Sequence, residues 1–480
     1  MKVVMLSCEA LPFVKVGGLA DVVYSLSQEL TKKKVSTSIV LPYFKSIKEN
    51  DLYKGKITFF KSFKVKMSWR TQIADVYKIK IGKVNYYLVG NNYYFNRDKV
   101  YNYDDDLERF SFFSLASYEL ISKIIKNIDI VHVHDWHCSI VPLLYQHFSK
   151  KNEIRFMLTI HNPCFQGVCR PCDLPDYLNL PESYFYNGLT RFDNNVNLLK
   201  TAIMLADRIT TVSNTHKSEL LNGISSYGLD RVLYLRNSDF SGILNGLDYG
   251  EFDPETDPYI YQKYNIQNVF EKKKINKEQI CKEFNFKHPE YPLFCVVSRL
   301  SKQKGIEFLI ANIEKILNYK MNLIILGTGD KEFENQLAFY CSNFDNVSCQ
   351  IKFSNELAHK IYASSDFLLM PSIYEPCGIS QMIAMKYGTI PIASKVGGLV
   401  DTITSYNEVN DKYANGILFN IDSDHLLLSI IFAIHLYSDK KDVVQKLIIN
   451  AMKKNFSWEK ACSEYYRLYS EMLQTKNALK

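Results

Sequence analysis

The chain has 480 residues, 47% of them hydrophobic, which is enough for a sizeable core and too long for one ordinary domain, so two domains are expected. Its 58 basic and 51 acidic residues leave a charge of +7 in short clusters, such as Lys32–Lys34 and Lys272–Lys274, rather than in the basic stripes of nucleic-acid-binding proteins. No apolar run reaches the ~18 residues of a membrane span, and the eleven irregularly spaced cysteines are typical of buried free thiols, so we expect a cytoplasmic protein without nucleic-acid or membrane partners.

The first half of the chain alternates short β-rich runs with longer helical patterns, as parallel α/β sheets do. Strands are predicted at 3–6, 37–41, 130–134, 155–160 and 208–212. The helix after the first strand has one continuous apolar stripe, formed by Leu19, Val22, Val23, Leu26 and Leu30. Residues 57–95 are predicted to be an insertion of alternating strands, rich in Tyr and Phe.

The second half repeats this alternation after a polar stretch, residues 249–290, that is predicted to be a linker. Strands are predicted at 293–298, 321–326, 347–351 and 367–370, and helices at 304–319, from 330 onward and at 355–364. The whole chain is therefore predicted to be an α/β protein with two doubly wound domains and a cleft between them.

The segment KVGGLADVV, residues 15–23, joins the first strand to the first helix, where doubly wound sheets bind their ligands. Gly17 and Gly18 are expected to take positive φ, so that successive N–H groups form an anion nest. Lys15 can add positive charge, and Asp21 can accept hydrogen bonds from hydroxyl groups. On this segment alone, a simple turn with an acid capping the helix explains the residues equally well.

Two later segments contain the side chains that a sugar diphosphate would need. SRLSKQKG, from residue 298, places Arg299 and Lys304 at a strand–helix junction, where a diphosphate would require neutralisation. Glu375 follows another buried strand, so its carboxylate can hold sugar hydroxyls while the next helix N-terminus faces phosphate. No P-loop sequence occurs, and Gly327-Thr328-Gly329 is followed by Glu332 instead of a third glycine, which disfavours NAD-dependent and P-loop enzymes.

Seven segments in the same order resemble the bacterial glycogen synthase and plant starch synthase family: KVGGLADVV at 15, HVHDWH at 132, TIHNPCFQG at 159, ADRITTVS at 206, GILNGLDYGEFDPETDP at 242, SRLSKQKG at 298 and EPCGISQMIAMKYGTIPIASKVGGLVDT at 375. The resemblance implies the GT-B fold, with Rossmann-like domains at 1–245 (acceptor side) and 246–457 (nucleotide-sugar side) facing a deep cleft. It also implies that a last helix, 458–480, crosses back to the first domain.

The implied activity is a retaining glucosyltransferase that elongates an α-1,4-glucan (glycogen) by moving glucose from ADP-glucose to the non-reducing end. The resemblance assigns catalytic roles to Glu375, His161, Asp135, Arg299 and Lys304. It assigns substrate binding to Lys15, Gly17, Gly18, Asp21, Asn162, Asn245, Cys377, Gly378 and Thr389. Arg299 and Lys304 would grip the diphosphate, on which negative charge grows in the transition state.

No metal and no cofactor are expected. Cys164, Cys169 and Cys172 match part of a ferredoxin pattern but lack a fourth ligand. Asp104-Asp105-Asp106 contains the Asp-x-Asp of metal-dependent glycosyltransferases but follows no strand. Val16 replaces the usual Thr of the first motif, with an effect that the sequence does not reveal.

Two alternatives stay open. One is UDP-glucose as the donor, or a related sugar-nucleotide transferase, because residue types do not identify the base. The other is a catalytically silent glucan-binding protein of the same fold, which the presence of Glu375, Arg299 and Lys304 disfavours. The second Glu of many related GT-B enzymes is replaced by Ile383, as expected for the synthase family. With no second carboxylate there, attack on the same face of the sugar is favoured over a covalent adduct.

Overall fold

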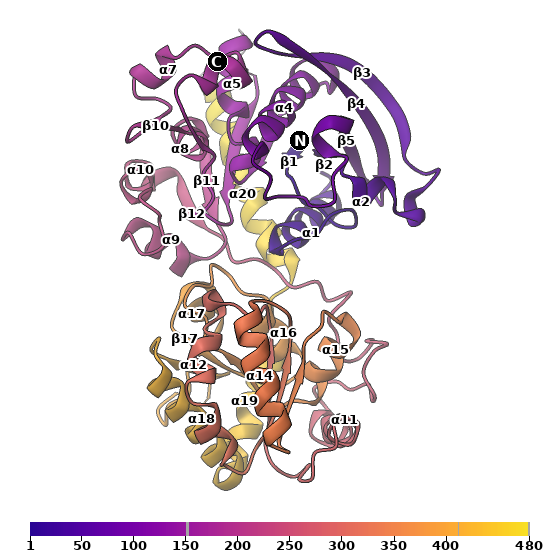
Figure 1. The fold of residues 1–480 in the computed structure, drawn as a ribbon, viewed down its shortest axis with the longest axis vertical. Helices are drawn as coiled ribbons and strands as arrows, with labels where there is room; N and C mark the ends of the chain where they lie inside the picture. Colours follow the sequence, from indigo (N-terminus) through magenta and orange to yellow (C-terminus); the bar gives the residue numbers. More distant parts are fainter. Residues whose placement is uncertain (150–152, 411, 479–480) are drawn as a thin grey trace. The chain divides into compact units, whose positions relative to one another are not determined.

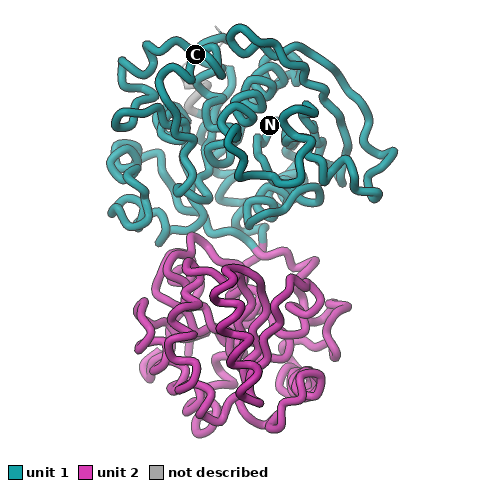
Figure 2. Tube along the Cα trace, viewed as in Figure 1, with its two compact units in different colours: residues 1–246, 458–480 teal, residues 247–457 magenta. Residues whose placement is uncertain are grey.

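The computed structural model describes residues 1–149, 153–410 and 412–478. They form two compact units, unit 1 with residues 1–246 and 458–480 and unit 2 with residues 247–457; Figure 2 shows both. The chain thus leaves unit 1 once and returns to it through α20 (Trp458–Ala478) (Figure 1). The final residues 479 and 480 of the predicted last helix lie outside the described residues.

Unit 1 contains a nine-stranded sheet in the order β12-β11-β7-β6-β1-β2-β5-β4-β3. Its strands are β1 (Lys2–Leu6), β2 (Ser36–Pro42), β3 (Thr58–Met67), β4 (Arg70–Ile81), β5 (Val84–Gly90), β6 (Ile130–His134), β7 (Arg155–Ile160), β11 (Arg208–Thr211) and β12 (Phe240–Gly242). All pair in parallel except β3–β4 and β4–β5, which form the long antiparallel arm labelled in Figure 1. The five strands predicted in this half and the strand insertion at 57–95 are confirmed.

A small sheet and eleven α-helices complete the described part of unit 1. The small sheet has the order β8-β10-β9, from β8 (Val168–Cys169), β9 (Arg191–Phe192) and β10 (Asn195–Asn197). Besides α20, the helices are α1 (Gly18–Lys32), α2 (Lys45–Lys48), α3 (Asn92–Phe95), α4 (Asp106–Glu119), α5 (Val141–Phe148), α6 (Asp173–Leu178), α7 (Ser183–Tyr186), α8 (Leu198–Leu205), α9 (Asn214–Leu221) and α10 (Asp230–Leu235). The apolar stripe predicted on α1 is buried throughout.

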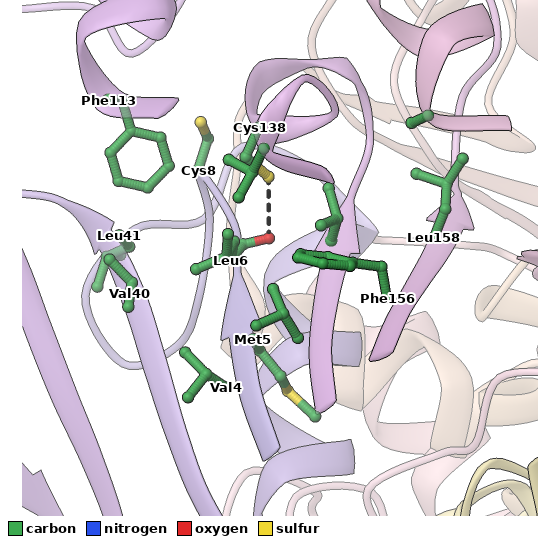
Figure 3. Packing of buried hydrophobic residues seen from close by; sticks show 14 of the residues in the cluster. Val4, Met5, Leu6, Cys8, Val40, Leu41, Phe113, Cys138, Phe156 and Leu158 are labelled. Atoms are coloured by element: carbon green, nitrogen blue, oxygen red, sulfur yellow. Dashed lines mark hydrogen bonds between the residues drawn. The ribbon is translucent and has the colours of Figure 1, made fainter. Parts of the chain in front are cut away.

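The core of unit 1 lies around the central strands. Figure 3 shows Val4, Met5 and Leu6 of β1 packed between side chains of β2 and of the elements that follow β6. These β1 residues are fully buried, because helices cover both faces of a parallel sheet. This is why the strand is a continuous apolar run in the sequence.

Unit 2 contains a six-stranded parallel sheet in the order β15-β14-β13-β16-β17-β18. Its strands are β13 (Leu293–Val297), β14 (Asn322–Leu326), β15 (Val347–Gln350), β16 (Phe367–Met370), β17 (Ile390–Ser394) and β18 (Ile417–Phe419). Its helices are α11 (Val269–Glu283), α12 (Ile306–Ile310), α13 (Ile313–Leu317), α14 (Lys331–Asn343), α15 (Asn355–Ser364), α16 (Ser380–Lys386), α17 (Gly397–Thr402), α18 (Ser423–Asp439) and α19 (Lys441–Lys453). The four strands predicted here and the helices at 330 and 355–364 are confirmed.

Two predictions for unit 2 are wrong in detail. The helix expected at 304–319 is broken into α12 and α13, because the buried Asn312 side chain turns away to donate a hydrogen bond to the Ser423 carbonyl, 2.8 Å away. The polar stretch 249–290 is part of unit 2 rather than a linker and contains α11. Its Lys273 side chain, which the sequence suggested to be at the surface, is buried and donates hydrogen bonds to three backbone carbonyls and to a hydroxyl.

In both sheets the order in which consecutive strands are added reverses at one place, the topological switch point. Numbered along the chain, the strands of unit 2 have the order 3-2-1-4-5-6, and the parallel strands of unit 1 have the order 3-2-1-4-5-6-7. The switch point therefore lies between β13 and β16 in unit 2 and between β1 and β6 in unit 1. Ligands of doubly wound sheets bind beyond the carboxyl ends of the strands at this point. No described helix is long and apolar enough to span a bilayer.

Candidate functional site

The switch point of unit 2 brings together a lysine and a glutamate. Lys304 follows β13 and Glu375 follows β16, and Nζ of Lys304 forms an ion pair with Oε2 of Glu375. The Ser372 hydroxyl donates to the same carboxylate oxygen at 3.1 Å. The two charged side chains are largely buried, so the pair is shielded from water and its attraction is stronger than at a surface.

Glycines let the loops of this site approach closely. Gly305 has φ 66°, and a Cβ there would overlap the Pro371 carbonyl oxygen. Gly397 has φ 40°, and a Cβ there would overlap the carbonyl oxygen of Glu375, which also accepts a hydrogen bond of 3.1 Å from the Gly398 amide. The backbone around Glu375 is thus held by contacts that other residues would prevent.

Arg299 lies at the end of β13, close to the pair in the sequence, but is exposed. Its Nη2 donates to Oε1 of Gln303 at 3.3 Å, and Gln303 in turn donates to the Tyr374 carbonyl at 3.2 Å. Gln303 therefore links the loop of Arg299 to the loop of Glu375. The guanidinium stays accessible to an anion.

The remaining residues predicted for unit 2 divide into two groups. Cys377 is buried, and Gly378 has φ 72°; both lie between β16 and α16, beside Glu375. Thr389 does not lie with them, because it precedes β17 and so sits at the amino edge of the sheet. Its fully buried hydroxyl oxygen lies 2.6 Å from the Tyr362 carbonyl oxygen and 2.8 Å from that of Ser365, either of which can accept its proton. The assignment of Thr389 to substrate binding is therefore wrong, since no ligand can reach it.

In unit 1 the switch point is marked by Asp135, the residue after β6. Its backbone has φ 55° and ψ −173°, a conformation that costs a non-glycine residue energy and that clusters at functional sites. Its Oδ1 accepts hydrogen bonds from the amides of His161, at 2.7 Å, and Asn162, at 3.3 Å. Burial raises the pKa of Asp135 to about 7, although these two N–H groups oppose the shift.

His161 follows β7 and is held from two sides. Its amide is bonded to Asp135, and its Nε2 lies 3.0 Å from Nδ1 of His134, the last residue of β6. Burial lowers the pKa of His161 to about 3, so its ring is neutral at physiological pH. Asn162 accepts a hydrogen bond of 3.1 Å from the Cys164 amide through its side-chain oxygen.

The loop after β1 contains a carboxylate that sequence reasoning missed. Oε2 of Glu9 accepts hydrogen bonds from the amides of Val16, at 2.6 Å, and Gly17, at 2.8 Å, and its Oε1 accepts one from the Tyr101 hydroxyl. Two successive N–H groups of this loop therefore bind an anionic group, but they are those of Val16 and Gly17, and the group is the Glu9 carboxylate. An acid in the loop between the first strand and the first helix of a doubly wound sheet is the signal that could have revealed it.

The conformation expected for the two glycines is wrong. Gly17 has an extended backbone with φ −141°, and Gly18 begins α1, so neither has positive φ. A Cβ on Gly17 would meet no atom within 4 Å, so glycine leaves open space there. Beside it, Nζ of Lys15 forms an ion pair of 2.8 Å with Asp21, and both side chains are partly exposed.

Two further residues complete the edge of unit 1. Asn245 lies three residues beyond β12 and is 6% exposed, and its side-chain oxygen has no hydrogen-bond partner among the described residues. Cys138 donates from its thiol to the Leu6 carbonyl at 3.1 Å, the dashed line in Figure 3. It thereby ties the segment after Asp135 to the end of β1.

Sequence reasoning also missed Phe353, which follows β15 at the carboxyl edge of the sheet of unit 2 and is 90% exposed. An exposed aromatic ring at a sheet edge where ligands bind is suited to stacking on a flat ring. No pattern around it distinguishes Phe353 from a core phenylalanine, so only the structure identifies it.

The cysteine pattern of Cys164, Cys169 and Cys172 and the aspartate pattern of residues 104–106 do not have the arrangement of metal ligands in the structure. Among the described residues, no three His, Cys, Asp or Glu side chains gather as ligands would. Cys169 is buried in β8, whereas Cys164 and Cys172 are exposed. Asp105 is bonded twice to Arg97, at 2.5 and 2.6 Å, so its carboxylate is already neutralised.

Comparison with known proteins gives matches over both units. Residues 2–234 match the family described as Starch synthase catalytic domain, and residues 277–453 match Glycosyl transferases group 1. Glycogen synthase of Clostridium beijerinckii is 39% identical over 480 residues, covering 98% of this chain and 99% of that protein. Glycogen synthase of Bacillus anthracis is 38% identical, covering 99% of this chain and 100% of that protein.

Among solved structures, the catalytic domain of Starch Synthase IV from Arabidopsis thaliana, bound to ADP and acarbose, superimposes with a TM-score of 0.90. It is 28% identical, with 98% of this chain and 99% of that chain covered. The fold is therefore GT-B, as the sequence predicted. The chain belongs to the glycogen synthase family, whose members are enzymes that transfer glucosyl units from a nucleotide sugar to a glucan.

Proposed function

We propose that the chain uses ADP-glucose to elongate an α-1,4-glucan at its non-reducing end, with retention of the α configuration, in the cytoplasm. The buried pair of Lys304 and Glu375 at the switch point of unit 2 is the observation that carries this proposal. A carboxylate that can hold sugar hydroxyls, next to a cation that can hold phosphate, is the pairing that a sugar diphosphate requires.

The donor side of the reaction is assigned to unit 2. Negative charge grows on the diphosphate as the C1–oxygen bond breaks, so Arg299 and Lys304 stabilise the transition state more than the bound substrate. Lys304 would exchange part of its contact with Glu375 for the diphosphate, which frees the carboxylate for glucose hydroxyls. Cys377 and Gly378 border the same sugar, since they lie two and three residues after Glu375 in the same loop.

The glucosyl and acceptor side is assigned to unit 1. The neutral imidazole of His161 can accept or donate a hydrogen bond without adding charge near the sugar. The Asp135 carboxylate, when ionised, favours the positive charge that develops on the glucosyl ring. Asn162 and Asn245 offer amide groups to hydroxyls.

The first loop of unit 1 is assigned to substrate binding as well. Lys15 and Asp21 contribute partly exposed charges, and the open space at Gly17, next to Gly18, leaves room for a ligand to approach.

Retention follows from attack on the face that the diphosphate leaves. The bond from C1 to the diphosphate oxygen breaks, and a bond from C1 to the 4-hydroxyl oxygen of the acceptor forms. The proton of that hydroxyl moves to the departing diphosphate. This route requires no carboxylate nucleophile, in keeping with Ile383 at the position where related enzymes carry a second Glu.

ADP-glucose is preferred to UDP-glucose on two grounds. The Starch Synthase IV structure is described as bound to ADP. Phe353 offers an exposed aromatic face to the base, and a purine has a larger stacking surface than a pyrimidine.

The test is incubation of the purified protein with glycogen and either ADP-glucose or UDP-glucose labelled in the glucosyl group. We expect label in α-1,4 linkages, released by a glucosidase specific for them, with ADP-glucose as the better donor by kcat/KM. The variant Glu375→Gln serves as the matched control and should incorporate little label. Equal or better use of UDP-glucose would overturn the donor assignment, and β-linked product would overturn retention.

A further inference from the structure

The last helix is connected to the central sheet of unit 1 by a buried chain of hydrogen bonds. The Tyr469 hydroxyl of α20 lies 2.7 Å from Nδ1 of His132, and Nε2 of His132 lies 2.6 Å from Oγ1 of Thr159. Oγ1 of Thr159 lies 2.6 Å from Oγ1 of Thr210, which donates to the Leu158 carbonyl at 3.4 Å. All five residues are almost completely buried, so water cannot replace any partner.

The carbonyl at the end of this chain sets the direction of every bond. A carbonyl can only accept, so we assign the single hydroxyl proton of Thr210 to it, because in the opposite direction the buried Tyr469 hydroxyl proton would have no acceptor among the described residues. Thr159 must then donate to Thr210, and His132 must donate to Thr159 from Nε2. Because a neutral imidazole has only one N–H, Nδ1 of His132 accepts from the Tyr469 hydroxyl. The hydroxyl of Tyr469 thus fixes one tautomer of His132 and the plane of its ring.

The ring of His132 contacts the ring that orients His161. His132 and His134 are two residues apart on β6, so they face the same side of the sheet, and their ring centroids are 4.1 Å apart. His134 is hydrogen-bonded to His161 at 3.0 Å. Burial lowers the pKa of all three histidines, so no charge on these rings holds the arrangement. Packing and hydrogen-bond direction alone set the position of the His161 imidazole.

We propose that Tyr469 is a positioning residue for the transfer reaction: it fixes His132, whose ring holds His134 in the orientation that hydrogen-bonds His161. This inference rests on the role proposed above for His161. It gives α20 a part in the chemistry in addition to its packing against α1, since the helix reaches the reacting region through one hydroxyl group.

The first experiment replaces Tyr469→Phe, which keeps the ring and removes the hydroxyl. We expect kcat to fall about tenfold with KM for the donor unchanged, since displacing a catalytic group by ~1 Å can cost up to 10²-fold. Tyr466→Phe is the matched control, because Tyr466 lies on the exposed face of the same helix and should keep wild-type kcat. A lower melting temperature with unchanged kcat in Tyr469→Phe would overturn the inference, because the hydroxyl would then serve packing alone.

A second variant breaks the same chain on the other side of His132. Thr159→Val removes the acceptor of the His132 Nε2–H and should also lower kcat, and adding Tyr469→Phe should lower it further by much less than tenfold. Independent, multiplicative losses would contradict an action through His132. Nitrogen NMR of labelled imidazoles gives a direct readout: the wild type and Tyr466→Phe should show His132 protonated at Nε2, and Tyr469→Phe should shift this signal.

His161→Ala separates failure of this inference from failure of the proposed function. If His161→Ala is inactive while Tyr469→Phe has normal kcat, the positioning role of Tyr469 is wrong and the proposed function stands. If His161→Ala turns over like the wild type, the role of His161 is wrong, and the inference falls with it.

Discussion

Asp135→Asn tests the electrostatics of the first unit most directly. The carboxylate is 7% exposed, and burial, reinforced by the nearby Glu9 carboxylate, raises its pKa from an ordinary value near 3.8 to about 7. The folded state therefore binds this proton more tightly than the unfolded state. Stability from this group is fully present below pH 4 and is lost as the pH rises through 7.

The shift of about three pKa units corresponds to a loss of about 4 kcal/mol in the free energy of unfolding between pH 4 and pH 8. Asparagine does not ionise, and its side-chain oxygen can still accept from the amides of His161 and Asn162. We therefore expect Asp135→Asn to be more stable than the wild type at pH 8, with a difference that shrinks steadily toward pH 5.

The three tryptophans of the chain provide the assay. Trp69, Trp136 and Trp458 all belong to unit 1, so the unfolding of this unit can be followed by their fluorescence in urea without interference from unit 2. The titration is repeated at pH 5, 6, 7 and 8 for both proteins. A difference in stability that does not change with pH would refute the reasoning, because it would mean that the Asp135 pKa is not raised.

The remaining predictions concern unit 2. Lys304→Ala and Arg299→Ala should each lower kcat/KM for the donor about 10²-fold, as loss of one preorganised contact does; near-normal kinetics in both would end the diphosphate assignment. Gly397→Ala should destabilise unit 2 by at least about 2 kcal/mol, measured by circular dichroism during urea unfolding, because its φ of 40° and the neighbouring Glu375 carbonyl exclude a Cβ. Phe353→Ala should raise KM for the donor about tenfold while Phe353→Tyr stays close to the wild type, and an unchanged KM in the alanine variant would exclude base stacking there.

The sequence predicted the parallel strands closely because strands covered on both faces are uninterrupted apolar runs. Lys304 and Glu375 could also be predicted, since each lies in the segment that joins such a run to the next helix. The strand order could not be predicted from the sequence, because it depends on which strands pair in space. Glu9 was missed for a different reason: its contact with the Val16 and Gly17 amides depends on how the loop after β1 folds, which the residue order alone does not show.

The errors have equally local causes. Thr389 belongs to the same sequence segment as Glu375, but the two residues lie at opposite edges of the sheet. Glu375 follows β16 at the carboxyl edge, and Thr389 precedes β17 at the amino edge, because α16 runs back between them. The sequence motif alone does not indicate this change of edge. Gly17 was expected to have positive φ because two glycines stand together. In the structure Gly17 leaves open space, and its amide binds the Glu9 carboxylate together with the amide of Val16.

The division of unit 1 into two segments has a consequence for how the protein is made. The amide of Leu247 donates to the Phe456 carbonyl at 2.6 Å, and Gly246 packs so tightly on Trp458 that a Cβ would overlap its backbone. Unit 2 is therefore an insertion whose two ends meet, and all of its residues are synthesised before α20. Unit 1, although begun first, is completed last, because the α20 side chains that pack on its core, Tyr469 beside His132 among them, are made only at the end of synthesis.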